Sequence, residues 1–291
     1  MIKFTVVFVS MLLSSTATAA GRQPFITNSR IESHTVTMTI DREIRALAAR
    51  EAEPVWLGYA VPSRSADHRM CCWSGSGSDC CTGCRLEPGS ATAVGLSGPQ
   101  AGAIALESGD SFFILYRMEK GEISRIRIFS EDCPLDAGGR TLYWLTGVRE
   151  DESVAFLATF VAPGSPNRLV DSALSALAMH RSPAALTRLL TAARDGTTTH
   201  LRGQALFWLA QRAGEQAVGA ITNAIANDPE TEVKRRAVFA LSQLPKNEGV
   251  PLLIQVARTN VNPAVRKQAM FWLGQSRDPR ALQFFQEVLF K

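Results

Sequence analysis

Apolar residues recur with a fixed period in the C-terminal part of the chain. Four segments align there without gaps, and their first residues lie 32 positions apart. The fifth position of every segment is alanine and the ninth is leucine. Self-similarity at a fixed period indicates a repeat architecture. The segments are LVDSALSALAM from Leu169, LRGQALFWLAQ from Leu201, VKRRAVFALSQ from Val233 and VRKQAMFWLGQ from Val265.

A second apolar set follows each segment at the same period. Its internal offsets of three and four residues place these side chains on one helix face. Each unit is therefore predicted to hold a first helix, a short turn and a second helix. Ser182-Pro183 and Asp278-Pro279 have the chemistry of helix starts, because a capping side chain precedes a proline. The set consists of Leu186, Val218, Val250 and Leu282, then Leu189, Ile221, Leu253 and Phe285, then Ala193, Ile225, Ala257 and Leu289.

A two-helix unit cannot bury its apolar stripe alone, so such units stack. The pattern resembles the HEAT-like repeat family, including the short variety associated with phycobilisome-lyase-type proteins. The resemblance, together with the N-terminal segment described below, suggests an exported bacterial HEAT repeat protein. The resemblance covers Asn167–Lys291 and implies an α-helical solenoid of four HEAT-like repeats over residues 167–291. Solenoids of this kind serve many unrelated roles, so the fold alone implies no activity.

Catalytic motifs are absent from the sequence. Some HEAT-like enzymes of the deoxyhypusine hydroxylase kind bind iron through His-Glu pairs on repeat helices, and no such pair occurs here. Neither the G-x-S-x-G motif nor the phosphate-binding G-x-x-x-x-G-K-[ST] motif occurs. We therefore expect no catalytic residue and no cofactor. His180 and His200 are expected on the surface, at helix ends.

The residues before the repeats predict a small α+β domain over residues 21–162. Alternation at Val36, Met38 and Ile40 favours a strand over residues 31–40, followed by a helix over 42–52 that Asp41 caps. Two apolar runs, 112–118 and 123–129, flank Glu119-Lys120-Gly121-Glu122 and predict a hairpin. Further strands are predicted at 56–61 and 141–148, a helix at 153–160, and a linker at 161–166.

The first 20 residues read as a signal peptide. Lys3 precedes ten apolar residues (4–13), and Ala17-Thr18-Ala19 fits a small-x-small cleavage site. A bilayer span needs about 20 apolar residues, so we expect export without a membrane anchor. The mature protein is then periplasmic or secreted.

Six cysteines lie between residues 70 and 133, and export would place them in an oxidising space. Structural disulfides are therefore expected, and the pairing stays open. The alternative is a metal site or a redox dithiol, because Cys81 and Cys84 have the C-x-x-C spacing. The cysteines are Cys71, Cys72, Cys80, Cys81, Cys84 and Cys133.

Charge is distributed unevenly along the chain. Residues 21–162 hold 14 Lys and Arg against 18 Asp and Glu, whereas residues 163–291 hold 16 against 9. The basic excess belongs to the repeats and suits an anionic ligand. It is too modest to indicate nucleic-acid binding.

Helical geometry places positions 3, 4, 7 and 11 of each segment opposite its core face. Position 7 is phenylalanine in repeats two to four, whereas repeat one has Ser175. The resulting ladder predicts a protein-binding surface, and the alternative is that the rings pack between neighbouring repeats. The predicted partner-binding residues are Phe207, Phe239, Phe271, Arg235, Lys267, Gln211, Gln243 and Gln275.

The last helix is more apolar than its counterparts. Phe285 and Leu289 fall at core positions, whereas Phe284, Val288 and Phe290 are extra. We expect this C-terminal edge to pack against a second copy of the chain or a partner, unless the helix end folds back onto repeat four.

The sequence therefore favours an exported, non-enzymatic scaffold that binds a protein through its repeats. The alternative is an envelope enzyme, or a redox or metal protein, that uses the region from Cys71 to Cys133.

The cysteine pattern predicts the effect of reduction. Because no cysteine lies in the repeats, mild reduction should loosen the N-terminal domain and leave the helical signal of the repeats intact. Thiol titration and far-UV circular dichroism before and after dithiothreitol measure both effects. Loss of helical signal on mild reduction would contradict the assignment.

Overall fold

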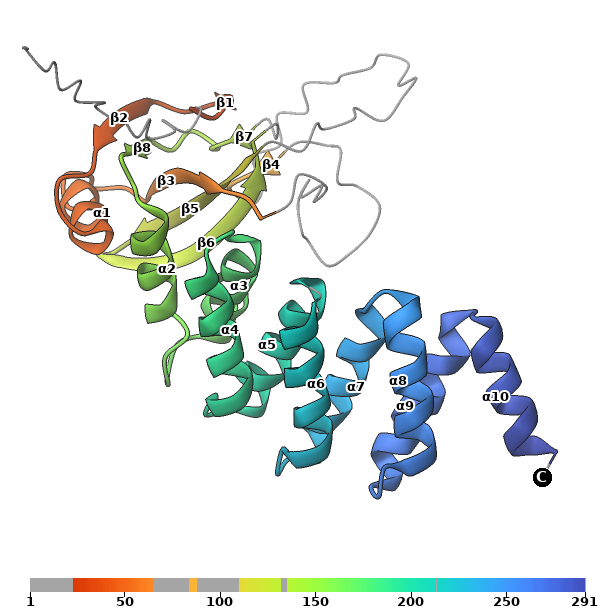
Figure 1. Ribbon diagram of the computed structural model, residues 1–291. Helices are drawn as coiled ribbons and strands as arrows, with labels where there is room; N and C mark the ends of the chain where they lie inside the picture. Colours follow the sequence, from red (N-terminus) through yellow and green to blue (C-terminus); the bar gives the residue numbers. More distant parts are fainter. Residues whose placement is uncertain (1–22, 65–83, 88–109, 132–134, 213, 291) are drawn as a thin grey trace, which may run out of the picture.

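The computed structural model describes residues 23–64, 84–87, 110–131, 135–212 and 214–290. In these residues, helical hairpins stack in a row that leads away from a β-sheet (Figure 1). The predicted solenoid is confirmed. Its first helices are α3 (Asn167–Met179), α5 (Thr199–Arg212), α7 (Thr231–Gln243) and α9 (Pro263–Ser276). Its second helices are α4 (Pro183–Asp195), α6 (Glu215–Asn227), α8 (Lys246–Thr259) and α10 (Pro279–Leu289).

The invariant alanine and leucine of each repeat form the seam of the stack. Both positions are at most 1% exposed in all four repeats, because alanine lets neighbouring helices approach and leucine fills the space between them. Predicted caps are also present: Ser182 Oγ accepts from the Ala184 amide, and Asp278 Oδ1 accepts from the Arg280 amide. The seam residues are Ala173, Ala205, Ala237, Ala269, Leu177, Leu209, Leu241 and Leu273.

A basic residue near the start of three first helices caps the end of the preceding hairpin. Arg202 donates to the carbonyl of Gly196 at 2.8 Å, and Lys234 donates to the carbonyl of Ala226 at 3.0 Å. Arg266 repeats the contact with the carbonyl of Asn260 at 2.8 Å. Cations stabilise helix C-termini because unpaired carbonyls gather there. Part of the excess of basic residues in the repeats therefore stabilises the stack of helices.

The N-terminal region holds a five-stranded sheet in the order β2-β8-β3-β5-β6. The β5–β6 turn has positive φ at Lys120 (52°) and Gly121 (80°), as a two-residue hairpin turn requires. The predicted hairpin is thus confirmed. The strands are β2 (Ile31–Thr35), β8 (Leu142–Thr146), β3 (Val55–Pro62), β5 (Ser111–Glu119) and β6 (Glu122–Ser130).

The predicted strand over residues 31–40 is wrong in its second half. Strand β2 ends at Thr35, and helix α1 (Ile40–Ala48) begins where the strand was expected to continue. The buried Glu43 carboxylate accepts hydrogen bonds from the amides of Thr37 and Met38 at 2.7 and 3.0 Å and so turns the chain. These bonds, with the Thr37 amide foremost, lower the pKa of Glu43 to about 2. The predicted cap also fails, because Asp41 lies inside the helix and pairs with Arg45.

The two sheet faces have different covers. One face packs with α1, α2 (Glu150–Thr159) and the repeats into a single hydrophobic core. The other carries a second core beneath a small parallel sheet of β1 (Ile26–Thr27), β7 (Leu135–Asp136) and β4 (Cys84–Arg85). Strand β4 contains Cys84, while the other five cysteines and the signal-type leader lie outside the described residues. The disulfides and export therefore stay predictions.

His180 is buried, so its predicted surface position is wrong. It follows α3 and bridges to Ser63 beyond β3, and its Nε2 lies 3.1 Å from Ser153 Oγ. The hydroxyl of Tyr59 continues this chain at 2.9 Å from Ser153. We call Tyr59, Ser153, His180 and Arg212 the joint, because they tie the sheet and α2 to the first two repeats.

Arg212 completes the joint by capping α3. The buried guanidinium donates to the carbonyls of Leu177, Ala178 and His180 at 3.3, 3.1 and 2.8 Å. Burial lowers the pKa of Arg212 to about 10, which still leaves it charged at neutral pH. Burial, with the nearby Arg212 charge, lowers the pKa of His180 to about 3. The imidazole is therefore neutral in the folded protein.

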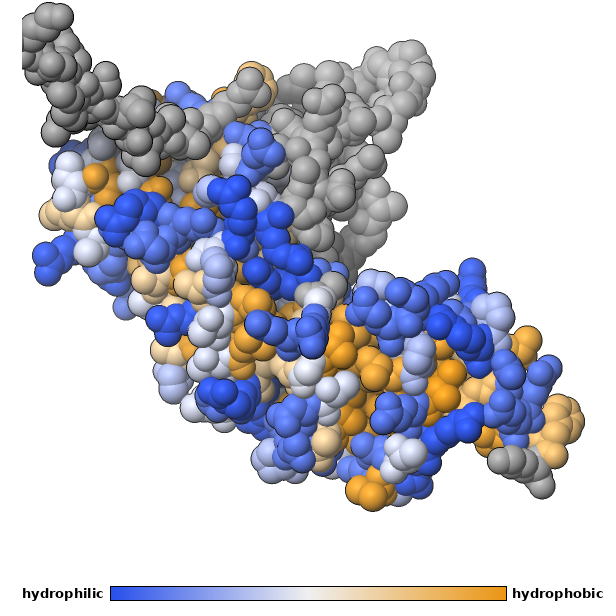
Figure 2. Space-filling view, viewed as in Figure 1, coloured by the Kyte–Doolittle hydropathy of each residue, from blue (hydrophilic) through white to orange (hydrophobic). Residues whose placement is uncertain are grey.

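The last hairpin exposes the helix face that earlier hairpins bury. Leu189, Ile221 and Leu253 are at most 1% exposed because a following first helix covers them. Among the described residues no helix follows α10, so Leu289, in the same apolar stripe, is 77% exposed. Hydrophobic surface is visible over α10 at this end of the row (Figure 2).

The prediction is wrong for one residue of the C-terminal edge. Phe284 was expected to be uncovered, but it is 3% exposed and packs beneath the guanidinium of Arg258 at 5.2 Å. The side chain folds back because α10 contacts α8 of the preceding repeat on this side. Leu282, Val288, Leu289 and Phe290 form the exposed part of the edge.

The joint predicts a pH-dependent stability. Between pH 6.5 and 3 the unfolded chain binds a proton at His180 that the folded protein does not, so falling pH favours unfolding. From pH 7 to 5 this contributes a loss of about 2 kcal/mol in the free energy of unfolding. Urea unfolding of wild type and His180→Gln at both pH values measures it. The variant should lack this loss, whereas His200→Gln should retain it; equal slopes in all three proteins would contradict the burial of a neutral imidazole.

Candidate functional site: a groove between the sheet edge and the repeats

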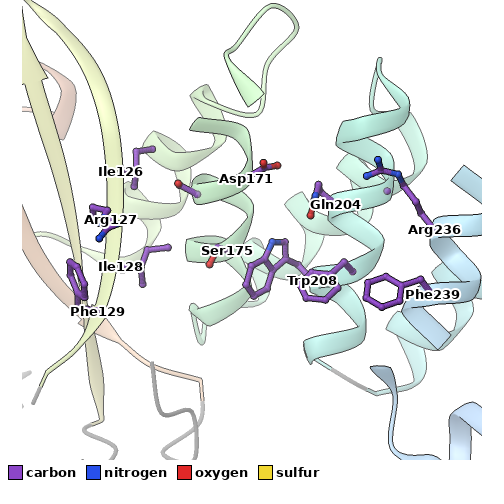
Figure 3. A pocket seen from close by; sticks show the side chains of 13 residues that line it. Ile126, Arg127, Ile128, Phe129, Asp171, Ser175, Gln204, Trp208, Arg236 and Phe239 are labelled. Atoms are coloured by element: carbon purple, nitrogen blue, oxygen red, sulfur yellow. The ribbon is translucent and has the colours of Figure 1, made fainter. Parts of the chain in front are cut away.

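A groove of about 490 Å³ lies between β6 and the first helices of repeats one to three. Figure 3 shows β6 on one side, α3 beside it, and α5 and α7 beyond. The sheet contributes four consecutive residues, Ile126 to Phe129. A volume of this size is typical of a binding site.

The groove exists because repeat one lacks the bulky residue that its neighbours carry. Position 7 is Ser175 in repeat one and phenylalanine in the other repeats. Together with Ser172, Ser175 forms a low floor on α3 between the strand and the aromatic side chains of α5. The sequence showed this substitution, but its consequence depends on β6 lying beside α3.

Gly203 shapes the far side of the groove. A side-chain carbon at this position would lie 2.2 Å from Arg236 Cδ, so only glycine allows the arginine stem to lie across α5. The guanidinium of Arg236 stays near the groove and pairs with Glu232 at 3.3 Å. Across the groove, Asp171 pairs with His200 at 2.7 Å. The groove therefore has one acidic and one basic flank.

Aromatic rings form the wall opposite β6. Phe207 and Phe239 are partly buried and stack with centroids 5.9 Å apart and planes 4° from parallel. Trp208 packs edge-on against Phe207 at 5.1 Å. The rings bury one side against the helices and turn another toward the groove.

The aromatic row continues past the groove. Trp272 lies 4.9 Å from Phe239, and Phe271 lies 4.9 Å from Trp272. Phe271 is 53% exposed. The first two rings of the ladder therefore pack between repeats, whereas the last ring faces solvent, and the protein-binding role of the ladder stays a prediction.

The other predicted partner-binding residues follow the same face but do not line the groove. Arg235 contacts Glu232 and Gln268 and is exposed, as is Lys267. Gln243 and Gln275 border a smaller hollow near Trp272, and Gln211 is partly buried. Sequence reasoning missed the residues of β6, which lie far away in the chain and carry no signal for the contact.

The Glu150 carboxylate lies beside Ser153 and His180 of the joint, but the geometry of the three side chains does not suit catalysis. Ser153 and His180 are both 0% exposed, and Ser153 Oγ is also bonded to Tyr59. His180 Nδ1 lies 3.6 Å from Glu150 Oε1, beyond hydrogen-bonding distance. A nucleophile needs access to its substrate. The cluster is a structural connection.

Across the described ranges, no three His, Cys, Asp or Glu side chains gather closely enough to hold a metal ion. The part of the chain that the structure describes contains no helix long and apolar enough to cross a bilayer. The proposed cysteine-based metal or redox site falls almost entirely outside the described residues.

Residues 218–290 match the protein family described as HEAT repeats. Curated protein sequences give no significant match. One of 17 matching chains of solved structures belongs to the complex of CpcE and CpcF of phycocyanin lyase from Nostoc sp. PCC7120. It is 18% identical, with a TM-score of 0.37, and the match covers 48% of this chain and 89% of that chain.

The matched residues span the second helix of repeat two and all of repeats three and four. The same spacing of 32 residues and the same alanine and leucine seam extend through repeats one and two. The C-terminal part of this chain is therefore built of HEAT-like repeats.

Proposed function

We propose that this protein is a non-enzymatic scaffold that binds a segment of a partner polypeptide in the groove between β6 and the repeats. The observation that carries the proposal is the groove itself. Its floor is small and polar, its wall is aromatic, and the sheet and the repeats build it together. Partly exposed aromatic rings are typical of the residues that dominate protein interfaces.

The aromatic row favours an extended partner over a small ligand. Phe207, Phe239 and Phe271 belong to three successive repeats, whose first helices lie about 8–10 Å apart. The row is therefore about 20 Å long, the length of about six residues of extended chain. A small molecule would use the groove and leave Phe271 without a role.

Charge supports binding of a segment with an acidic residue toward repeats three and four. Arg235, Arg236 and Lys267 lie at that end, and Asp171 lies at the opposite flank. Arg235 and Arg236 share Glu232, so one carboxylate faces two guanidinium groups. The predicted signal peptide supports a location of this binding activity in the periplasm or outside the cell.

Filling the floor of the groove tests the proposal. In Ser175→Phe the new ring restores the residue found in the other repeats and occupies the space that the partner would use. Peptides of about 12 residues, selected by phage display on the wild-type protein, serve as probes. Their affinity for Ser175→Phe should fall at least about tenfold, because a central pocket is lost. Isothermal titration calorimetry measures the affinity.

Two matched variants separate loss of the site from loss of the fold. Thr187→Phe adds the same ring on the exposed face of α4 and should bind the peptides like wild type. Phe207→Ala removes the wall and should also weaken binding. Thermal melts establish that each variant is folded. Unchanged affinity in folded Ser175→Phe and Phe207→Ala would show that the groove is not the binding site.

The exposed C-terminal edge supports a second interaction, with another copy of the chain. Leu282, Leu289 and Phe290 are 61%, 77% and 86% exposed, and contiguous apolar surface of this kind favours association. We expect a dimer mass by light scattering for wild type and a monomer mass for Leu289→Ser with Phe290→Ser. Leaving Phe284 unchanged preserves the buried contact with Arg258. A monomer mass for both proteins would reject the dimer.

A further inference from the structure

We infer that the smaller hollow near Trp272, between repeats three and four, binds an arginine side chain of a protein partner. The hollow has a volume of about 200 Å³ and is lined by the end of α7, the first half of α8 and the end of α9. It shares no lining residue with the groove, so the inference goes beyond the proposed function. The chain itself shows which side chain fits, because the same place is filled between repeats one and two.

Arg212 fills that place between repeats one and two. It is the twelfth residue of its repeat, counted from Leu201, and it reaches back to the end of α3. Its Nη1 donates to the carbonyls of Ala178 and His180 at 3.1 and 2.8 Å. The last carbonyls of a helix have no partner within the helix, so the guanidinium supplies the donors that this helix end lacks.

The twelfth position holds a different residue in each later repeat. In repeat three it is Leu244, which is 5% exposed, so an apolar side chain fills the second interface. In repeat four it is Ser276, whose hydroxyl donates to the carbonyl of Leu273 in its own helix at 2.7 Å. The small serine leaves the third interface open, and the hollow lies there.

The helix end that borders the hollow matches the one that Arg212 caps. Helices α3 and α7 end at equivalent residues, and the residue that follows each of them, His180 or Leu244, is extended. The counterparts of the Ala178 and His180 carbonyls are those of Ser242 and Leu244, two repeats further along. Among the described residues no side chain donates to either of these two carbonyls. A guanidinium in the hollow would give them the bonds that Arg212 gives to α3.

The walls of the hollow suit the rest of an arginine side chain. Leu241, Val250 and Leu253 line it and would contact the methylene groups of the stem. Trp272 also lines it, and a guanidinium binds favourably over an indole ring. Of the lining residues only Lys246 is charged, and it is exposed, so solvent and salt screen its repulsion.

The rim of the hollow favours an arginine within a polypeptide over free arginine. Gln243 and Gln275 are exposed there, and their amide groups can both donate to and accept from a peptide backbone. Trp272 also contacts Phe239 of the groove, with ring centroids 4.9 Å apart, so the hollow continues the aromatic row. No carboxylate lines the hollow to pair with a free amino group.

An NMR titration of the full chain labelled with ¹⁵N-tryptophan tests the inference. The probe is Nα-acetyl-arginine amide, which resembles an arginine inside a polypeptide. The indole signal of Trp272 should shift with the probe, whereas that of Trp208, the equivalent ring of repeat two, should not. Nα-acetyl-norleucine amide offers a similar stem without the guanidinium. It should bind at least about tenfold more weakly, because it cannot donate to the carbonyls.

Two substitutions at one position provide a matched pair. Ser276→Arg places the side chain of Arg212 in the hollow and should weaken binding of the arginine probe at least about tenfold. Ser276→Ala removes the same hydroxyl but leaves the hollow open, so it should bind the probe like wild type. Thermal melts establish that both variants are folded.

Three results would overturn the inference: equal affinity for the arginine and norleucine probes, tighter binding of free L-arginine than of the blocked probe, or unchanged binding to folded Ser276→Arg. A shift confined to Trp208 would also overturn it, because the probe would then occupy the groove. The proposed function is decided separately by the binding of groove peptides to Ser175→Phe, whose ring lies outside the hollow.

Discussion

Each helical hairpin must be covered on both sides, and this constraint governs the whole molecule. The alanine and leucine seam meets it between repeats, because each of the first three hairpins buries its stripe against the next one. The first hairpin has no preceding repeat among the described residues, and the sheet takes that place. Strand β6 and helix α2 pack on α3, and the buried joint around His180 and Arg212 fixes their position. The groove arises where a flat strand meets a row of helices.

The repeats were predictable because their information is local and periodic. A 32-residue spacing, with an alanine and a leucine in each first helix, specifies the repeats without reference to the rest of the chain, and α4, α9 and α10 also begin with a capping side chain before a proline. The β5–β6 hairpin was predictable for the same reason, since Lys120 and Gly121 mark its turn. The prediction of a strand over residues 31–40 was wrong because the alternation of apolar residues continues past the point where Glu43 turns the chain. The Glu43 carboxylate accepts hydrogen bonds from the preceding amides of Thr37 and Met38, and such contacts leave no periodic signal in the sequence.

The groove was only partly predictable. Phe207 and Phe239 belong to the ladder that the sequence indicated, and both line the groove. The contribution of β6 to the groove was not foreseen, because nothing local connects Ile128 with Ser175. The predicted surface position of His180 was wrong for a related reason. A histidine at a helix end is commonly exposed, and only the contact with β3 and α2 buries it. What sequence reasoning missed are contacts between segments far apart in the chain.

The arrangement of repeats also has a mechanical consequence. Each hairpin touches only its neighbours, so a small rotation at each interface adds to the next along the row. The groove lies at the end where the sheet and the joint pack against the first repeats. The far repeats, which carry Lys267 and Phe271, are tethered only through the stack. A partner bound in the groove, as proposed, would therefore contact repeats packed against the sheet at one end and repeats that can rotate about their interfaces at the other.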